Sequence, residues 1–352
     1  MTKILVENKN MKDFKKITDS DFEKIKEFHL FAGIGGGIYG GELLGHQCCG
    51  GVEILPYAQS VLKQRQKDGW MHEFPIFGDI CTLNGSDFKG QFDVLCGGFP
   101  CQAFSTAAHG KNIKEKNLWG EMLRFARESE SPIVFAENVV LRAIDKAKDD
   151  LEEIGYKVVR CRLSCSDIGA DHQRNRFWLL AVKDQDVFEK IAKHLKSLPI
   201  LKGNYWATNI NDVGENIEVE GNNRRKQLLG VGNAQSPFVV ASAFRILVNR
   251  MINDEINKNE VVSSEEISQV FEIKPTWIQN TFDNIGLVHT PTTMANYSCP
   301  SMMKHQGCRN FKVVFGRPEP NNAEYLMGFP IGSSNPSPIN NSNFINWKTY
   351  IL

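Results

Sequence analysis

Short runs of apolar residues, each followed by a segment long enough for a helix, recur along the first half of the chain. The runs are Phe28–Ala32, Gly50–Ile54, Phe92–Leu95, Ile133–Ala136, Lys157–Leu163 and Phe177–Val182. A continuous apolar run of about four to eight residues is typical of a buried strand. Strands that alternate with helices predict a doubly wound α/β domain, which we place at residues 28–183.

The segments outside that domain have different patterns. Residues 1–27 are charged, with apolar residues at loosely helical intervals, which predicts an amphipathic helix or a partly ordered tail. Residues 184–223 hold one further expected helix, Val187–Leu198, and then a polar stretch, so we interpret them as a short variable region. Helical periodicity returns at Phe238–Met251, and residues 224–252 are expected to complete the first domain.

The rest of the chain divides into two parts. The charged run within residues 253–270 is typical of a linker. Residues 271–352 are rich in Asn, Pro, Ser and Thr with aromatic residues between them, which predicts a turn-rich C-terminal module. Two interpretations of this module remain open: an irregular β or loop module, and an extension that packs on the main fold.

Charge and cysteine usage bear on the partner and the compartment. The 41 basic residues cancel the 41 acidic ones, so any contact with a polyanion must come from local patches. The nine cysteines include no Cys-x-x-Cys pair, and the start of the sequence lacks the apolar stretch of a signal peptide, which predicts a cytoplasmic location. No apolar run approaches the ~20 residues of a membrane span.

A zinc site is the metal centre that the cysteines would suggest. Its ligands would be Cys161, Cys165, Cys299, His305 and Cys308. Their spacings fit no familiar zinc motif, in which the ligands come in closely spaced pairs. We therefore predict that the protein needs no metal.

Cys101 is the candidate nucleophile. It lies in the triplet Pro100-Cys101-Gln102, after an expected buried strand and a glycine turn. A thiolate at the carboxyl end of a strand lies where open α/β sheets bind their ligands, whereas a lone cysteine is more often buried and inert. We favour the reactive interpretation because the chain also carries candidate partners at strand ends, namely Glu137, Asn138, Arg174 and Arg176.

Each of these partners also has an ordinary interpretation. Glu137 follows an apolar strand and lies at the same expected edge as Cys101, but taken alone it could be a surface carboxylate. Arg174 and Arg176 point to the same side of an extended segment and could hold a base carbonyl and a phosphate together. Taken alone, such arginines are more often a solvated face. The prediction of a site therefore depends on the whole set.

A second set of residues predicts a nucleotide-like ligand. The glycine segment Phe31–Gly37 follows the first strand and permits close backbone approach to a ligand. Glu53 lies at the end of the next strand, where a carboxylate can accept hydrogen bonds from both ribose hydroxyls. Asp79, expected at the end of a third strand, could accept from an adenine amino group. Together they predict an adenosine pocket, although glycines and acids also occur in ordinary loops.

The two sets together resemble the DNA cytosine-C5 methyltransferases. Leu30–Gly37, Gly97–Ser105, Glu137–Val139, His172–Arg176 and Gly232–Ala234 resemble, in order, motifs I, IV, VI, VIII and X of that family. The resemblance covers about Phe28–Met251. Three positions depart from the usual pattern: His172 replaces a glutamine, His29 an acidic residue, and Ile54 an aromatic residue. Arg225 resembles the motif IX arginine, with Arg224 as the competing assignment, and the wording of the motifs is similar to a phage or prophage branch.

The resemblance implies a fold, a reaction and a cofactor. The fold would be that of the class I S-adenosylmethionine-dependent methyltransferases, a Rossmann-like mixed sheet with a smaller target-recognition region. Cys101 would add to C6 of cytosine, Glu137 would hold or protonate N3, and Arg174 would support the C2 carbonyl, with Arg176, Gln102 and Asn138 beside them. S-adenosylmethionine would be held by Phe31, Ala32, Gly33, Gly35, Gly36, Glu53, Ile54, Asp79, Ile80, Gly98, Pro100, Asn233 and Ala234.

The implied partner is double-stranded DNA with the target cytosine turned out of the helix. The basic segment 107–117 could close over DNA, although a solvated lysine cluster is the simpler interpretation. The expected DNA-binding residues are Ser105, His109, Lys111, Lys114, Lys116, Arg224, Arg225, Arg309 and Arg317. We expect a monomer that contacts no membrane and could be accompanied by a restriction endonuclease.

The motifs leave two candidates for the segment that reads the target sequence. Members of this family usually read DNA with a domain between motifs VIII and IX, but that interval is short here. Either Asn209–Asn223 forms a minimal reader, or the C-terminal module reads the DNA, and we favour the second.

Three other functions fit parts of the sequence. An RNA cytosine-C5 methyltransferase would share the fold, but that branch commonly carries a Cys-Phe-Thr tripeptide that this chain lacks. A catalytically silent DNA-binding module would not need the complete set of Cys101, Glu137 and Arg174. Transfer of a modified group in place of methyl is the third alternative.

Overall fold

The structure is a computed structural model that describes residues 24–100, 118–217, 223–292 and 299–352. Its centre is a sheet of seven strands in the order β3-β2-β1-β4-β5-β7-β6. The first five strands in this order are mutually parallel, and β7 runs antiparallel to both of its neighbours. The predicted mixed α/β sheet of the Rossmann-like type is therefore confirmed.

The strands lie close to their predicted positions, with no end shifted by more than three residues. Each predicted apolar run forms one strand of the sheet, and a short strand, β3, lies at one edge just before Asp79. The strands are β1 (Lys26–Leu30), β2 (Gln47–Val52), β3 (Ile76–Phe77), β4 (Val94–Gly98), β5 (Ile133–Asn138), β6 (Lys157–Leu163) and β7 (Arg176–Val182).

Helices cover both faces of the sheet, so side chains of one strand enter two separate cores. Along β5, Ile133 and Phe135 pack in one core and Val134 and Ala136 in the other. The first core includes α1 (Gly36–Leu43), α2 (Pro56–Lys67), α5 (Gln185–Ser197) and α9 (Pro237–Ile252). The second includes α3 (Leu118–Glu128), α4 (Leu141–Glu153) and the 3₁₀ helices η3 (Ile80–Thr82) and η4 (Gly85–Phe88). This double covering explains why the strands are apolar throughout.

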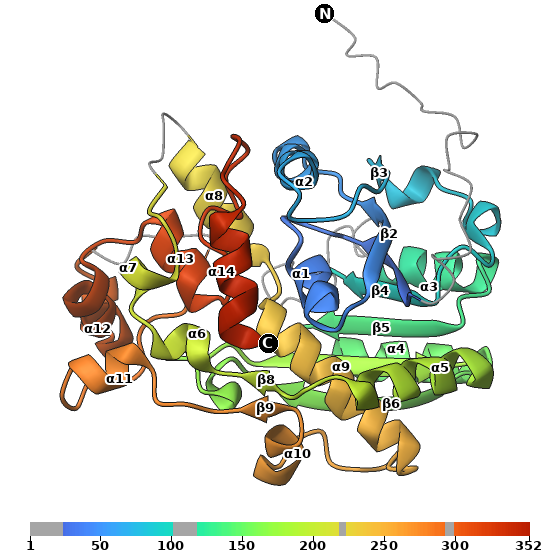
Figure 1. The fold of residues 1–352 in the computed structure, drawn as a ribbon. Helices are drawn as coiled ribbons and strands as arrows, with labels where there is room; N and C mark the ends of the chain where they lie inside the picture. Colours follow the sequence, from blue (N-terminus) through green and yellow to red (C-terminus); the bar gives the residue numbers. More distant parts are fainter. Residues whose placement is uncertain (1–23, 101–117, 218–222, 293–298) are drawn as a thin grey trace, which may run out of the picture.

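A second unit, which we call the helical lobe, contains the described residues of 199–217 and 271–352. Its elements are β8 (Leu201–Lys202), α6 (Asn204–Ala207), α7 (Ile210–Val213), β9 (Phe271–Glu272), α11 (Trp277–Thr281), η7 (Met302–Lys304), α12 (Gln306–Phe315), α13 (Pro320–Leu326) and α14 (Ser342–Ile351). Figure 1 shows the lobe beside one end of the sheet.

The helical lobe unites residues 199–217 of the variable region with the described part of the C-terminal module. Strand β8 pairs in parallel with β9, although the two strands are far apart in sequence. The Tyr205 hydroxyl donates to the Phe329 carbonyl at 2.6 Å, and the Trp206 indole donates to the Tyr325 carbonyl at 3.0 Å. The Glu215 amide also donates to the Asn343 side-chain oxygen at 2.8 Å, so the described part of the candidate reader Asn209–Asn223 packs against the C-terminal module.

The lobe is more helical than its composition predicts. Its polar residues act at helix ends: Thr276 caps α11 in a capping box, and Pro320 is at the start of α13. Its aromatic residues pack inward, and Trp347 stacks on Phe238 of α9 with ring centroids 5.9 Å apart. In the described residues of 271–352, helices at residues 277–281, 302–304, 306–315, 320–326 and 342–351 alternate with turns, so the irregular β or loop interpretation is wrong for these segments, and the module packs on the main fold.

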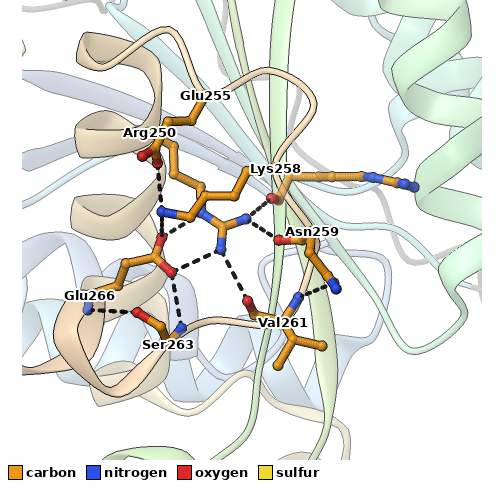
Figure 2. A network of polar contacts seen from close by, with 8 residues as sticks. Arg250, Glu255, Lys258, Asn259, Val261, Ser263 and Glu266 are labelled. Carbon is orange, nitrogen blue, oxygen red and sulfur yellow. Dashed lines mark hydrogen bonds and ion pairs between the residues drawn. The ribbon is translucent and has the colours of Figure 1, made fainter.

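The segment between the sheet and the lobe is held by a buried arginine. Arg250, only 1% exposed, donates to the carbonyls of Arg160 and Asn259 and forms an ion pair with Glu266 at 2.7 Å. Figure 2 shows the guanidinium at the centre of this network. Glu266 also completes the capping box of α10 (Ser264–Ser268). The charge run that predicted a linker thus includes groups that fix residues 253–266 against β6.

The remaining elements connect these units. They are η6 (Ser166–Ile168), between β6 and β7, and α8 (Asn223–Asn233), between the variable region and α9. In the part of the chain that the structure describes, no helix has the length and apolar character needed to cross a membrane.

Candidate active site

The sheet brings the predicted site residues to one edge. The carboxyl ends of β1, β2, β4 and β5 meet there because these strands are parallel. Strand β7 is antiparallel to β5, so its amino end, which begins with Arg176, lies at the same edge. This edge, outside the carboxyl ends of the strands, is where open α/β sheets bind ligands.

Glu53 organises the glycine segment. Its carboxylate is 6% exposed and accepts hydrogen bonds from the backbone amides of Gly33 and Leu55, each at 2.7 Å. Phe31 and Gly33 both have a φ of 55°, a conformation that favours glycine. A carboxylate oxygen can accept two hydrogen bonds, so the carboxylate keeps accepting capacity for ribose hydroxyls.

The surroundings of Glu53 fit an adenosine group. A side chain placed on Gly33 would meet no other atom within 4 Å, so there is open space above this residue. Ile54 and Leu55 are 65% and 51% exposed, which is unusual for large apolar side chains directly after a buried strand. Open space, an ordered carboxylate and exposed apolar groups are what a purine nucleoside requires.

Asp79 and Ile80 lie at the next strand end, after β3. The Asp79 carboxylate accepts from the Cys81 amide at 2.9 Å and so caps η3, while the Ile80 side chain is buried. Capping gives Asp79 a structural role in addition to the predicted contact with adenine.

Glu137 is held from two sides. The carboxylate is 7% exposed, and the Nε atom of Arg176 lies 3.1 Å from one oxygen. The side-chain amide of Gln235 donates to the other oxygen at 3.2 Å. A buried carboxylate with a cationic donor on one side and a neutral donor on the other is fixed in orientation and satisfied in charge.

The two arginines of the motif VIII segment have different partners. Arg176 faces Glu137, whereas the buried Arg174 donates to the carbonyls of Gly232 and Ala234, both at 2.9 Å. From the sequence we predicted that both arginines hold a base carbonyl and a phosphate. In the structure Arg174 ties the end of α8 to the sheet.

Asn138 anchors the segment that leads to the predicted nucleophile. Its side-chain amide donates to the Phe99 carbonyl at 2.9 Å, and its oxygen accepts from the Val140 amide at 3.0 Å. Phe99 also packs on Trp119, with ring centroids 5.0 Å apart. The chain up to Pro100 is therefore fixed beside Glu137. The predicted site residues Cys101, Gln102, Ser105, His109, Lys111, Lys114 and Lys116 lie outside the described residues.

The motif X segment contacts the glycine segment directly. Asn233 is exposed and Ala234 is buried at the end of α8. A side chain on Gly36 would lie 2.2 Å from the Gln235 carbonyl oxygen, so only glycine allows this approach. The segment that carries the predicted cofactor residues Asn233 and Ala234 thus passes close to Gly36 through the adjacent Gln235.

The predicted DNA-binding arginines lie on α8 and the helical lobe. Arg224 and Arg317 both pair with Glu319, and Arg225 is exposed. Arg309 is exposed and donates to the carbonyls of Met303 and Lys304 at 3.0 and 2.7 Å. Within the described residues, none of these arginines forms an ion pair or hydrogen bond with the sheet edge, and exposed ion pairs such as that of Arg317 contribute little to stability.

Sequence reasoning missed Gln235 and a buried polar cluster beneath the glycine segment. His29 and His46 both contact the Glu27 carboxylate, at 2.9 and 2.6 Å. Burial acts to raise the pKa of Glu27, but the two histidines outweigh it and lower the pKa to about 2. Glu27 and His29 alternate with apolar residues in β1, and this pattern is the signal that could have revealed the cluster.

The same cluster gives the one group of closely spaced metal-ligating atoms within the described ranges. Atoms of Glu27, His29 and Cys96 lie within 4.8 Å of one another. Both Glu27 oxygens already accept from histidines, and burial raises the pKa of the Cys96 thiol well above its usual value. We therefore interpret the group as hydrogen-bonded. The cysteines and the histidine that we considered as zinc ligands form no such group there.

Comparison with known proteins identifies the family of this chain. Residues 25–313 match the family model of the C-5 cytosine-specific DNA methylases. This match covers most of the chain, and the protein belongs to that family.

Similar proteins include several type II methyltransferases. M.CviJI of Paramecium bursaria Chlorella virus IL3A is 35% identical over 166 residues, which are 45% of this chain and 43% of that protein. M.MspI of a Moraxella species is 30% identical over 204 residues, 54% of this chain and 45% of that protein. M.HhaI of Haemophilus parahaemolyticus is 29% identical over 178 residues, 48% of this chain and 52% of that protein. The chain thus spans about half the length of each relative.

A solved structure of a putative DNA modification methyltransferase encoded within an Escherichia coli prophage is also similar. It aligns with 86% of this chain and 97% of its own length, at 18% identity and a TM-score of 0.40.

Proposed function

We propose that this protein is a DNA cytosine-C5 methyltransferase that uses S-adenosylmethionine. The observation that carries the proposal is the meeting, at one sheet edge, of Glu137 between two donors and Glu53 beneath an open glycine segment. Glu137 suits the amidine-like edge of a base such as cytosine, and Glu53 with the glycine segment suits a nucleoside. Family membership supports the same combination.

The residues at this edge have distinct roles in the proposal. The Cys101 thiolate adds to C6 of cytosine, and Glu137 holds or protonates N3, so that negative charge does not build up on the ring. C5 then becomes nucleophilic. The glycine segment, Glu53 and Asn233 would hold S-adenosylmethionine, which would supply the electrophilic methyl group and leave as S-adenosylhomocysteine. Loss of the C5 proton releases the cysteine and restores the aromatic ring.

Arg176 and Arg174 have different roles in the proposal. Arg176 contacts the Glu137 carboxylate directly. Arg174 donates to the carbonyls of Gly232 and Ala234, which flank the predicted cofactor residue Asn233. We retain the proposed role of Arg174 toward the C2 carbonyl, to which it would add the positioning of the motif X segment.

The helical lobe is our proposed reader of the DNA sequence. Residues 199–217 and the C-terminal module pack as one unit, so the lobe includes described residues of both earlier candidates. Arg309 and Arg317 lie on its surface, and arginine recognises guanine well. The base must leave the duplex, at a cost of a few kcal/mol, before it reaches Glu137.

Finer features remain part of this proposal. A phage or prophage branch is supported by one viral relative, and a partnership with a restriction endonuclease by the type II relatives. We further propose a monomer that works without a metal in the cytoplasm, where its DNA substrate would be found.

Sequencing after bisulfite conversion tests the proposal. DNA from cells that express the protein should contain protected cytosines in one sequence context, and Cys101→Ala should abolish that protection. Cys81→Ala, which removes an exposed thiol but keeps the backbone amide that donates to Asp79, is the matched control and should leave it intact. Unprotected DNA in all samples, or protected cytosines confined to RNA, would contradict the proposal.

A further inference from the structure

Gln235 joins three parts of the site that lie far apart in the sequence. Its side-chain nitrogen donates to Glu137 on β5. A side chain on Gly98 would lie 2.8 Å from the Glu137 oxygen and 2.9 Å from the Gln235 nitrogen, so both groups close over the end of β4. The backbone carbonyl of Gln235 lies directly against Gly36 of the glycine segment. Gln235 therefore links the expected base and cofactor sites.

The other end of the Gln235 amide is also enclosed. Its oxygen and the Nδ1 atom of His29 lie 2.8 and 3.1 Å from the position that a side chain on Gly37 would take. His29 is held by Glu27, which is held in turn by His46. Glu27, His29 and Gln235 line a small cavity beneath the glycine segment. The buried cluster thus lies behind the amide and limits its rotation.

We infer that Gln235 is a positioning residue for Glu137 and couples that carboxylate to the glycine segment. The inference rests on the proposed function. Arg176 alone would leave the carboxylate free to turn about its last bond, because one contact does not fix a plane. The Gln235 donor on the opposite oxygen fixes that plane. Reaction rates depend steeply on such placement, and a shift of about 1 Å can cost roughly a hundredfold.

Two substitutions of similar size separate this role from packing. Gln235→Met removes the amide but keeps the length of the side chain. We expect it to lower kcat about 10- to 100-fold, while KM for S-adenosylmethionine and for DNA stays within about threefold. Gln227→Met is the matched control, because Gln227 is a buried glutamine of α8 outside the site. It should leave both constants within about twofold.

Gln235→Glu gives a pH signature that a packing role would not give. Arg176 is the charged group that contacts Glu137, and His29 lies at the far end of the amide. At about pH 8.5 the introduced carboxylate repels Glu137, and kcat should fall below that of Gln235→Met. At about pH 6 the introduced carboxyl can be protonated and donate a hydrogen bond again. The kcat of this variant relative to wild type should therefore rise about tenfold as the pH falls.

The outcomes distinguish the inference from the proposed function. Rates are measured on a duplex that contains the site found by bisulfite sequencing, and thermal unfolding of each variant is recorded. If wild type methylates the duplex but Gln235→Met stays within threefold, or Gln235→Glu follows wild type at every pH, the inference is wrong and the function stands. An equal loss in Gln227→Met also overturns it. If wild type methylates no cytosine in DNA, both the proposed function and the inference that rests on it are wrong.

Discussion

The sheet and the helical lobe each bury a glutamate, and the two carboxylates have opposite surroundings. Glu27 in β1 is held by two histidines, which lower its pKa to about 2. Glu324 in α13 is held by the amides of Gly332 and Ser334 and by the Ser334 hydroxyl, and burial raises its pKa. The sheet thus buries a charge together with its counter-charges, whereas the lobe surrounds a carboxylate with neutral donors.

This difference matches the way the two regions are built. In the sheet, side chains reach one edge because parallel strands end together, and they hold one another: Arg176 and Gln235 hold Glu137, and Gly33 donates to Glu53. In the lobe, neutral groups and aromatic rings hold two distant segments together. The predicted DNA-binding arginines remain on its surface. Reactive groups are therefore positioned by the rigid sheet, and the proposed reading surface is carried by the packed lobe.

The largest effect should come from the sheet edge. Glu137→Gln keeps the shape of the side chain but removes the group that can hold a proton at N3. We expect kcat to fall about 10²- to 10⁴-fold, the usual contribution of a positioned acid or base. Steady-state methylation of the identified duplex measures it. Glu153→Gln, an exposed glutamate of α4, is the control. A loss below threefold would move the chemistry away from Glu137.

The buried glutamates should give pH dependences of opposite sign. The pKa of Glu27 falls from 4.5 to about 2 on folding, so its stabilising effect is present above about pH 5 and is lost as the pH falls toward 2. That effect is worth about 3 kcal/mol in the free energy of unfolding. The pKa of Glu324 is raised on folding, so its contribution becomes less favourable as the pH rises through its unfolded pKa of 4.5.

Urea unfolding at several pH values measures this contrast. The deficit in free energy of unfolding of Glu27→Gln relative to wild type should shrink between about pH 5 and pH 3. The deficit of Glu324→Gln should instead grow as the pH falls toward about 4.5, the pKa of the unfolded chain, and change little below that value. Parallel curves for the two variants would show that the two sites do not differ in the proposed way.

The cofactor end of the sheet edge should give a smaller effect. Glu53→Gln removes the charge that orders the Gly33 amide and is expected to hold the ribose. Charge-assisted hydrogen bonds are worth about 1.5 to 3 kcal/mol, so the Kd for S-adenosylmethionine should rise about 10- to 100-fold. Calorimetric titration measures it, with the exposed Glu73→Gln as the control. An unchanged Kd would place the cofactor elsewhere.

The smallest effect should come from the surface of the lobe. Arg309→Ala and Arg317→Ala should each weaken DNA binding about 3- to 10-fold and reduce the salt dependence by about one ion, without changing kcat. Filter binding at several salt concentrations measures this, with the exposed Lys196→Ala of α5 as control. Removal of residues 271–352 is a poor test, because Trp347 and Tyr325 belong to the same core as α9. Equal binding by both variants and the control would rule out this surface as the reader.

Much of the sheet could be predicted from sequence. Runs such as Ile133–Asn138 are apolar at every position up to Glu137 because helices cover both faces of the sheet. Such a run can be recognised in the sequence without knowing which strands pair with it. The candidate chemistry was also recognisable, since Glu53 and Glu137 follow such runs directly. The lobe was harder to predict, because Asn, Pro and Thr residues that cap short helices have the same composition as loops.

The sequence by itself determined which chemical groups reach the sheet edge, because a strand end follows from local periodicity. Only the tertiary structure decided which groups meet there. Gln235 reaches Glu137 across 98 residues, and Arg174 turned to α8 while Arg176 turned to Glu137. Such pairings depend on the order of strands and on the return of α9 beneath the glycine segment. Contacts between distant segments leave no local pattern in the sequence, so they can be identified only in the folded structure.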